Sequence, residues 1–192
     1  PVGIRSVNTT GGVVKQNTVT GSGSSSQLGI IYVNASNLTI TNNVVSNVGW
    51  GITIYSYDNV LCSNNTISNN EVFDISYGSG IHLQGNSDDN KVMNNTVSNK
   101  LINVNAGIML LSIPGNGSVL FGFCDNNIIK NNDVSGCEST PGVWIYFGCS
   151  NNTIGPNNSS NDNAWGLYFS PLSSANYTFN NTFLGNSECD IV

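Results

Sequence analysis

Two short motifs alternate along the chain, and their spacing limits the fold more than any other feature of the sequence. The first motif is glycine, an apolar residue, any residue and an apolar residue. The second is an Asn-Asn pair set between apolar residues. Copies of the first motif begin at Gly29, Gly51, Gly80, Gly107, Gly142 and Gly166, so successive glycines lie 22, 29, 27, 35 and 24 residues apart. Repeats with periods of this size indicate a solenoid, a propeller or an array.

The apolar residues within each repeat alternate over short segments, which is the periodicity of strands rather than helices. Leucine is too scarce for leucine-rich repeats, and a propeller blade needs about 40 residues or more. One coil of a β-helix per repeat fits best. We therefore predict an all-β fold, a single-stranded right-handed parallel β-helix (β-solenoid) of about seven coils. Residues 1–192 would form one domain, with an insertion around residues 112–123.

The two motifs also predict the core, because alternate residues of a strand point to the same side. The predicted inward columns contain Ile52, Ile54, Ile81, Leu83, Ile108, Leu110, Val143 and Ile145 from the first motif, and Ile40, Val45, Ile67, Val92, Val97, Ile129 and Val134 from the second. Glycine before each strand permits a bend that other residues resist. Asparagine tolerates the left-handed backbone of turns, and stacked asparagine side chains can form a hydrogen-bonded ladder from coil to coil.

Composition excludes several classes of protein. Charged residues make up 8% of the chain, far below the roughly 25% of ordinary soluble domains, and 34 asparagines take their place. The charge balance is acidic, with 11 Asp and Glu against 5 scattered Lys and Arg, so we expect no nucleic-acid partner. No apolar run is long enough to span a membrane.

The cysteines suggest an oxidising compartment. Cys124 and Cys149 precede matching turns, and on adjacent coils they would lie about 4.8 Å apart, within the range of a disulfide. We predict that these two pair. Cys137 and Cys189 could pair with each other, or Cys189 could form a bond to another molecule. Cys62 aligns with inward residues, so we predict that it is a buried thiol. Disulfides of this kind favour an extracellular or cell-surface location.

Asn-x-Ser/Thr sequons are dense, although many arise from the repeat itself. We take as glycosylation candidates Asn8, Asn34, Asn37 and Asn116. Glycans at these positions would require them to lie on the surface of an exported protein.

The repeat Asn-x-x-Ile-x-Asn-Asn-x-Ile-Ser-Asn, followed by Gly-Ile-x-Ile, resembles the parallel β-helix repeats of pectin-lyase-like proteins. It is most similar to the Asn-rich repeats of archaeal and bacterial surface proteins, and to those of periplasmic proteins related to nitrous-oxide-reductase maturation. The clearest copies span residues 37–54, 59–83 and 89–110. The resemblance implies this fold over nearly the whole chain but leaves function open, because the fold carries lyases, hydrolases, adhesins and inert scaffolds.

Carboxylates are the first candidates for chemistry, since polysaccharide lyases and hydrolases of this fold use clusters of them. Asp58, Asp89 and Asp125 could form a stacked column that binds Ca²⁺. Equivalent positions in other coils carry Ser36, Ser150 and Ala175, so we interpret the aspartates as turn residues. Glu71 and Asp74 are three residues apart, which places them on opposite faces of a strand rather than as a catalytic pair.

The resemblance to the periplasmic proteins suggests copper, but the chain offers few ligands. His82 is the only histidine, and Met93 and Met109 are the only methionines. Because His82 occupies an outward position, we interpret it as a surface histidine, and we predict no metal site and no cofactor.

Outward positions of the Gly-motif strands form the most informative surface. In the C-terminal half these would expose Met109, Leu111, Trp144, Tyr146 and Tyr168 on one face, beside the insertion that carries Phe121. Either the insertion folds over this face and buries it, or the face marks a protein partner or a sugar platform.

Neither end of the predicted solenoid carries a capping helix, and Phe179 and Phe183 lie in an apolar segment close to the last residue. Uncapped strand edges are templates for pairing with another chain. We therefore predict an extracellular structural protein, not an enzyme, that assembles with copies of itself into a filament, sheath or surface layer. The alternatives are a carbohydrate-binding or polysaccharide-cleaving β-helix, which would have a glycan partner, and a segment of a larger adhesin.

Overall fold

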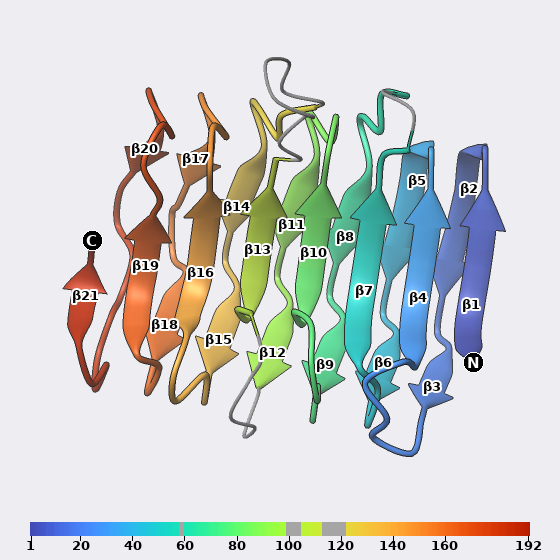
Figure 1. Ribbon diagram of the computed structural model, residues 1–192, viewed down its shortest axis with the longest axis horizontal. Helices are drawn as coiled ribbons and strands as arrows, with labels where there is room; N and C mark the ends of the chain where they lie inside the picture. Colours follow the sequence, from blue (N-terminus) through green and yellow to red (C-terminus); the bar gives the residue numbers. More distant parts are fainter. Residues whose placement is uncertain (58–59, 99–104, 113–121) are drawn as a thin grey trace.

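The computed structural model describes the whole chain except residues 58–59, 99–104 and 113–121. In the described part, 21 strands form three parallel sheets that run along a rod (Figure 1). Consecutive strands enter different sheets, and each strand pairs with the equivalent strand of the neighbouring coil. The chain is a right-handed parallel β-solenoid of about seven coils, which confirms the fold predicted from the repeat.

The eight-stranded sheet, called sheet A, holds the Gly-motif strands. Its strands in spatial order are β1 (Val2–Val7), β4 (Leu28–Val33), β7 (Trp50–Tyr55), β10 (Ile81–Gln84), β13 (Ile108–Leu111), β16 (Pro141–Tyr146), β19 (Trp165–Phe169) and β21 (Cys189–Ile191). Sheet B has seven strands, β2 (Thr10–Lys15), β5 (Ser36–Thr41), β8 (Thr66–Ser68), β11 (Lys91–Met93), β14 (Ile128–Lys130), β17 (Thr153–Ile154) and β20 (Tyr177–Thr178). Sheet C has six, β3 (Thr18–Thr20), β6 (Val44–Ser46), β9 (Glu71–Phe73), β12 (Thr96–Ser98), β15 (Asp133–Ser135) and β18 (Ser159–Asn161).

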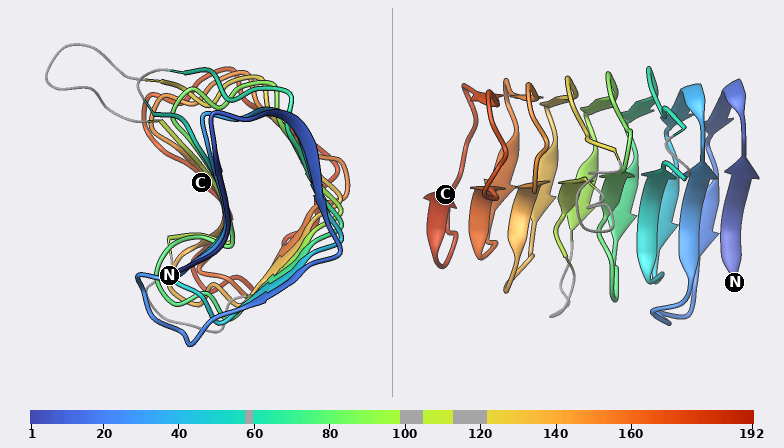
Figure 2. Two further views of the ribbon diagram at one scale, coloured as in Figure 1. Left: turned by 90° about the vertical axis from the view of Figure 1, so that its right-hand side faces the viewer. Right: turned by 45° about the horizontal axis from the view of Figure 1, so that its top comes forward.

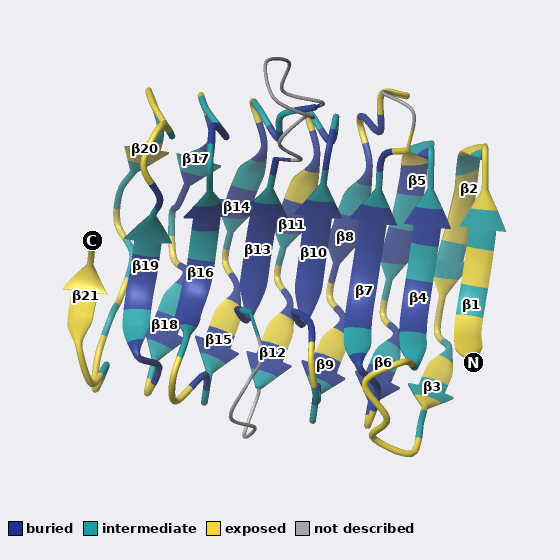
Figure 3. Cartoon of the chain, in the orientation of Figure 1, coloured by how far each residue is buried: buried dark blue, intermediate teal, exposed yellow. Residues whose placement is uncertain are grey.

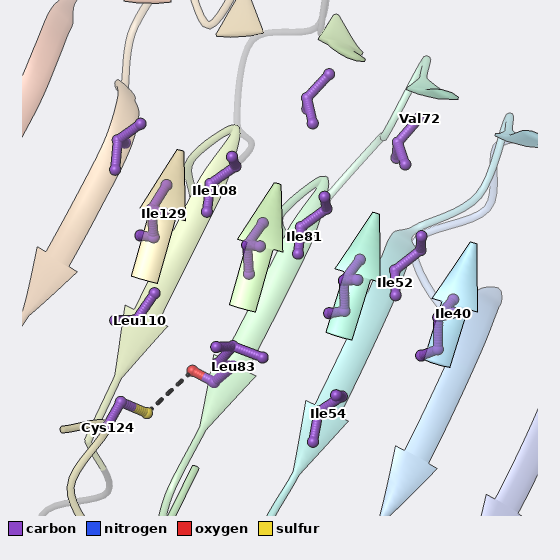
Figure 4. Packing of buried hydrophobic residues seen from close by; sticks show 14 of the residues in the cluster. Ile40, Ile52, Ile54, Val72, Ile81, Leu83, Ile108, Leu110, Cys124 and Ile129 are labelled. Atoms are coloured by element: carbon purple, nitrogen blue, oxygen red, sulfur yellow. Dashed lines mark hydrogen bonds between the residues drawn. The ribbon is translucent and has the colours of Figure 1, made fainter. Parts of the chain in front are cut away.

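The core is a set of apolar columns inside the rod (Figure 4). All of the inward residues predicted from the two motifs are fully buried. Identical positions of successive coils are paired in register, as Ile52 is with Ile81 and Ile81 with Ile108. Because the strands are only about 4.8 Å apart, branched side chains stack directly on one another and exclude water from the interior.

Two ladders of buried asparagines run along the rod at the ends of sheet B. Most of these amides donate from Nδ2 to the Oδ1 of the next coil, as Asn70 does to Asn95 at 3.0 Å and Asn95 to Asn132 at 3.0 Å. The same Oδ1 also accepts the backbone N–H of the preceding coil's asparagine. The ladder after sheet B comprises Asn17, Asn43, Asn70, Asn95, Asn132, Asn158 and Asn181. The ladder before sheet B is built from Asn65, Asn90, Asn127, Asn152 and Asn176.

The residue before each ladder position turns the corner in the left-handed conformation. Asn94 has φ 56° and Asn131 has φ 54°, a region that Asn enters more readily than most residues because its short side chain bonds locally. The Asn-Asn pair therefore has two roles, with the first residue making the turn and the second joining the ladder.

Burial changes along the rod (Figure 3). Strands β7, β10, β13 and β16 are buried through most of their length, whereas β1 and β21 are mainly half-buried or exposed. In β10 the outward residue His82 is as buried as its inward neighbours. In the centre of sheet A, outward side chains such as Thr53, His82 and Met109 are therefore buried as well, which the alternation of apolar and polar residues did not predict.

Candidate functional site

Sheet A forms the back of the concave side of the rod. In the end-on view of Figure 2, connections at both ends of this sheet project beyond its outer face. The outer face of sheet A therefore lies between these connections, and the side chains on it come from one strand of every coil. We call this face, which carries the two hollows described below, the trough.

The glycine of the first motif determines which side chains reach the trough. A Cβ at Gly51 would lie 2.7 Å from Val72 Cγ1 in the core and would collide with the carbonyl oxygen of Gly80. Since Gly51 and the following Ile52 both face the interior, the residue before the glycine is turned to the outer face. Trp50 reaches the trough in this way. Gly166 does the same for Trp165, since its Cβ would meet Phe183 Cδ1 at 2.7 Å.

Three rows of outward side chains result. The pre-glycine row contains Leu28, Trp50, Ser79, Ala106, Pro141 and Trp165. The middle row contains Arg5, Ile31, Thr53, His82, Met109, Trp144 and Tyr168, and the end row contains Val7, Val33, Tyr55, Gln84, Leu111 and Tyr146. Sequence reasoning recovered the middle and end rows but missed the pre-glycine row, although the residue before each glycine was the available signal.

The first hollow in the trough lies over β4, β7 and β10 and has a volume of about 280 Å³. Its lining comprises Leu28, Ile31, Trp50, Thr53, Tyr55 and Gln84. The buried hydroxyl of Thr53 has no hydrogen-bond partner. A flat indole beside an unpaired hydroxyl is the composition expected of a site for a small polar ligand with apolar faces.

The second hollow lies over β16 and β19, has a volume of about 220 Å³, and is lined by Pro141, Trp144, Trp165 and Tyr168. Its rings hold one another edge to face, with 5.7 Å between the centroids of Trp165 and Tyr168 and 5.8 Å between those of Trp144 and Tyr168. The indole N–H of Trp144 donates to Ser170 Oγ at 2.8 Å, which fixes its orientation. The side chains therefore form a preformed aromatic surface.

His82 lies between the two hollows and is fully buried, which corrects our expectation of a surface histidine. Trp50 stacks on its ring, with centroids 5.3 Å apart and planes inclined by 22°. Neither ring nitrogen has a hydrogen-bond partner. Burial lowers the pKa of His82 to about 4, so the ring is neutral at physiological pH.

The carboxylate column differs in one position from the one we considered. Asp88, not Asp89, aligns with Asp125, whose backbone N–H donates to Asp88 Oδ1 at 2.8 Å. Burial, with a smaller effect of the charges on Asp125 and Asp89, raises the pKa of Asp88 to about 6, and burial also raises the pKa of Asp125. Asp58 lies outside the described residues.

Each of these aspartates accepts a backbone N–H from the next coil, as Asp125 Oδ1 does from Ser150 at 2.6 Å. Serine performs this role elsewhere in the column, where Ser36 Oγ accepts the N–H of Ser63 at 3.0 Å. Glu71 is exposed on β9 of sheet C and Asp74 follows the end of that strand, so these two carboxylates lie on a different sheet from the hollows.

The predicted interface residues differ in exposure and in position. Trp144, Tyr146, Tyr168 and Leu111 lie half-buried on the outer face of sheet A. Met109 is 4% exposed, so the prediction that it is exposed is wrong. Phe183 packs against the core and Phe179 beside Gly155, away from that face. Phe121 falls outside the described residues, as does most of the predicted insertion.

Cys124 and Cys149 are adjacent at the corner between sheets A and B, but they are two buried thiols rather than the predicted disulfide. Cys124 also contacts the carbonyl oxygen of Leu83, at 3.4 Å from Sγ (Figure 4). Burial, and then the neighbouring Cys149 thiol, raise the pKa of Cys124 well above its ordinary value. Cys62 is a buried thiol, as predicted, and its pKa is also raised by burial.

The remaining cysteines and the sequons are arranged as follows. Cys137 is buried in the core and Cys189 is exposed on β21, which does not support a bond between them. Among the glycosylation candidates, Asn34 Nδ2 donates to Asn8 Oδ1 at 3.1 Å, so the atom that would carry a glycan is engaged. Asn37 is exposed at a corner, and Asn116 is outside the described residues.

Two features are absent from the described part of the chain. No three side chains of His, Cys, Asp or Glu gather there into a group that could hold a metal ion. No helix in the same part of the chain has the length and apolar character needed to cross a membrane.

The sequence matches the family described as "Periplasmic copper-binding protein (NosD)" over residues 2–108 and 112–189. No curated protein sequence matches the chain. Among solved structures, a mutant of the periplasmic alginate epimerase AlgG is similar over 100% of this chain and 48% of its own, with 19% identity and a TM-score of 0.69.

The A-modules of two mannuronan C-5 epimerases from Azotobacter vinelandii are also similar. AlgE6 is 14% identical over 95% of this chain and 61% of its own, with a TM-score of 0.58. AlgE4 is 12% identical over 100% of this chain and 56% of its own, with a TM-score of 0.55. This chain thus spans roughly half the length of these enzymes, and at such identities the likeness establishes the fold alone.

These comparisons correct two of our expectations. The prediction of a self-assembling structural protein is wrong, because the matching family is described as copper-binding and the structural neighbours are epimerases, not filament subunits. The prediction that the chain is not an enzyme is contradicted by the same neighbours, all of which are enzymes. The carbohydrate alternative accords better with them.

Proposed function

We propose that this chain, which belongs to the NosD family, is a carbohydrate-active β-helix that binds a polysaccharide along the outer face of sheet A. The observation that carries the proposal is the pair of aromatic-lined hollows on one face of the rod. Trp50 on β7 and Trp165 on β19 are four strand positions apart along sheet A, which corresponds to about 19 Å. Two aromatic sites in line along a trough suit a linear polymer.

The composition of the hollows favours an uncharged polymer. Neither hollow is lined by Asp, Glu, Lys, Arg or His. The nearest cation in the three rows is Arg5, exposed on β1 beside Ile31, and the chain carries a net charge of −6. Long-range repulsion therefore opposes a polyuronate. Indole and phenol rings offer apolar faces to sugar C–H groups, while Thr53 and Gln84 offer hydrogen bonds to hydroxyls.

Affinity electrophoresis of the full chain in gels that contain neutral glucans, mannans or galactans tests this proposal. We expect at least one neutral polysaccharide to retard migration, and Trp165→Ala to weaken the binding about tenfold or more. Tyr177→Ala is the matched control, since Tyr177 is an exposed aromatic residue on β20 of sheet B. No retardation by any polysaccharide, or equal losses in the two variants, would contradict the proposal.

The same experiment with mannuronan tests the carbohydrate-binding proposal separately from the inference that the polymer is uncharged. Preferential binding of mannuronan would show that the trough binds carbohydrate but that our inference of an uncharged polymer is wrong. NMR of the polysaccharide after incubation would reveal any change of sugar configuration or chain length, which directly tests for activity.

An envelope location agrees with the periplasmic description of the family, and we propose that the protein works outside the cytoplasm. Whether it stays at the cell surface can be tested by labelling intact cells with an antibody against the exposed corners.

The family description also raises copper as a second candidate ligand. A Cu(II) site of several imidazoles or carboxylates does not fit, because the described residues contain no such cluster. The donors fit Cu(I) better, since an imidazole with two unpartnered nitrogens lies next to a thioether in sheet A, at His82 and Met109. These two residues would hold the ion, which would add a soft cationic centre beneath Trp50.

A further inference from the structure

We propose that the second hollow, over β16 and β19, is an aromatic cage that binds a quaternary ammonium group, such as the trimethylammonium head of choline. The inference goes beyond the proposed function, because a small cation needs only this hollow, whereas a polymer would follow the whole trough. It rests on the shape, the chemistry and the electrostatic surroundings of the hollow.

The first observation is the arrangement of the rings. The Tyr168 ring lies 5.8 Å from the Trp144 ring, with planes inclined by 81°, and 5.7 Å from the Trp165 ring, with planes inclined by 69°. Rings at such angles face one volume from several directions, which parallel stacked rings do not. Pro141 completes the lining of this hollow of about 220 Å³. The hollow therefore has the form of a cage rather than of a flat platform.

The second observation is that the protein itself holds the rings in place. The indole N–H of Trp144 donates to Ser170 Oγ at 2.8 Å, and Tyr146 packs edge to face against Trp144 with 4.9 Å between the ring centroids. Pro141 pairs with Trp165 across adjacent strands of sheet A. A ligand that enters a preformed site does not have to order it, so less of the binding free energy is lost.

The third observation is the chemistry of the lining. The four side chains are aromatic rings and one proline, without a carboxylate or an amide. A primary ammonium has three N–H donors, and leaving such donors unpaired on burial is costly. A quaternary ammonium has no N–H group, and its positive charge is attracted to the π-faces of aromatic rings, most strongly to that of Trp. The cage therefore favours a fully methylated cation over a primary amine.

The fourth observation is the distribution of charge along the chain. Residues 131–192, which supply all four lining side chains, contain five Asp and Glu and no Lys, Arg or His. Residues 1–130 contain six Asp and Glu and five Lys and Arg, so most of the net charge belongs to the part that builds the cage. Glu188 and Asp190 are exposed at β21, the strand next to β19. An acidic surface of this kind attracts cations and repels anions.

Three small ligands separate the contributions of charge and methyl groups. The full chain is titrated with choline, with ethanolamine, and with the neutral isostere of choline in which carbon replaces nitrogen, and tryptophan fluorescence follows binding at constant ionic strength. We expect choline to bind at least tenfold more tightly than the other two. Equal binding of the isostere would mean an ordinary apolar pocket, and equal binding of ethanolamine would mean attraction by charge alone. Either result, or no binding of choline, would overturn the proposal.

A pair of variants locates the choline site. Trp165→Leu keeps an apolar side chain but removes the π-face, and it should weaken choline binding at least tenfold. Tyr177→Leu, which removes an exposed ring from β20 of sheet B, should leave the affinity unchanged. Equal affinities in the two variants would overturn the proposal. Circular dichroism verifies that both variants are folded.

Saturation-transfer NMR on the unsubstituted chain gives a reading that needs no variant. Irradiation of the aromatic protons should transfer saturation to the methyl protons of choline more strongly than to its methylene protons, because the cage surrounds the trimethylammonium head. Stronger transfer to the methylene protons would contradict the proposed orientation and overturn the proposal. No polysaccharide is present in these titrations, so their outcome is separate from that of the affinity gels.

Discussion

The asparagine ladders and the outer face of sheet A are built from the same coils, yet they satisfy their polar groups in opposite ways. In the ladder, the Asn95 amide donates to Asn132 and to two backbone carbonyls and accepts two hydrogen bonds from Asn70. On the outer face, the equally buried His82 and Thr53 leave polar atoms without partners. The repetition of Asn at every ladder position therefore stabilises the corners. The middle row of sheet A is not repetitive, because its residue changes between coils, from Thr53 to His82 to Met109 to Trp144.

This contrast separates the residues that specify the rod from those available for binding. A ladder residue must be Asn, because its amide has to donate and accept along one axis. A residue on the outer face has no such requirement, since its backbone is already paired within the sheet. Unpaired buried polar groups are costly, so their concentration on the one face that also carries two hollows marks that face as the functional one.

The largest effect on stability is expected when a ladder is broken. Asn95→Ala would leave the Nδ2 and backbone N–H of Asn70 without their acceptor, so we expect the free energy of unfolding to fall by about 4 kcal/mol. Urea denaturation followed by circular dichroism measures this change. Asn17→Ala, at the half-buried first position of the same ladder, should cost far less. Similar losses in both variants would mean that the ladder does not stabilise the rod.

The next test concerns the outer face. The pKa of His82 is lowered from 6.5 to about 4 by burial, so the unfolded chain binds more protons than the folded chain between these values. Stability should then be lost as pH falls from 6.5 to 4, by about 3 kcal/mol in total. His82→Gln should remove this dependence. A pH profile of urea unfolding that is unchanged in the variant would show that His82 is not buried as described.

The smallest effect is expected at the corner column. Burial raises the pKa of Asp88 from 3.8 to about 6, so its contribution has the opposite sign, and stability is lost as pH rises from 3.8 to 6. Because Asp88 is only half-buried, solvent screening should limit the effect to less than about 1 kcal/mol. Asp88→Ser keeps an acceptor for the Asp125 N–H, as serine does elsewhere in the column. We expect a slightly higher melting temperature at pH 7, and a lower one would contradict this assignment.

The fold could be predicted from the sequence because the same pattern of glycine, apolar and asparagine residues recurs in every coil. Ile52, Ile81 and Ile108 occupy the same position in three copies of the first motif. The inward direction assigned to one of them is therefore supported independently by the other two. The roles of the two residues of each Asn-Asn pair follow from the same regularity, since the left-handed turn and the ladder are both local preferences of Asn.

The candidate site was less predictable because it depends on how the strands bend. Trp50 and Trp165 precede glycines, and simple alternation would have turned them inward. Only the close approach of Gly51 to the core shows that they reach the outer face. The burial of His82 depends on Trp50 and on neighbouring strands, so no pattern within its own strand could reveal it. The alignment of Asp88 with Asp125 also required the true register of the corners.

The direction of the ladder hydrogen bonds has a consequence for how such a protein can change length. Every ladder asparagine offers the same oxygen to the coil before it and the same N–H to the coil after it. Duplication or loss of one whole coil would therefore join two surfaces that already match, whereas a gain or loss of part of a coil would misalign both ladders at once. Evolution of the rod should proceed in whole coils, with the turns between strands free to vary in length, and the number of binding positions along sheet A would increase or decrease by the same steps.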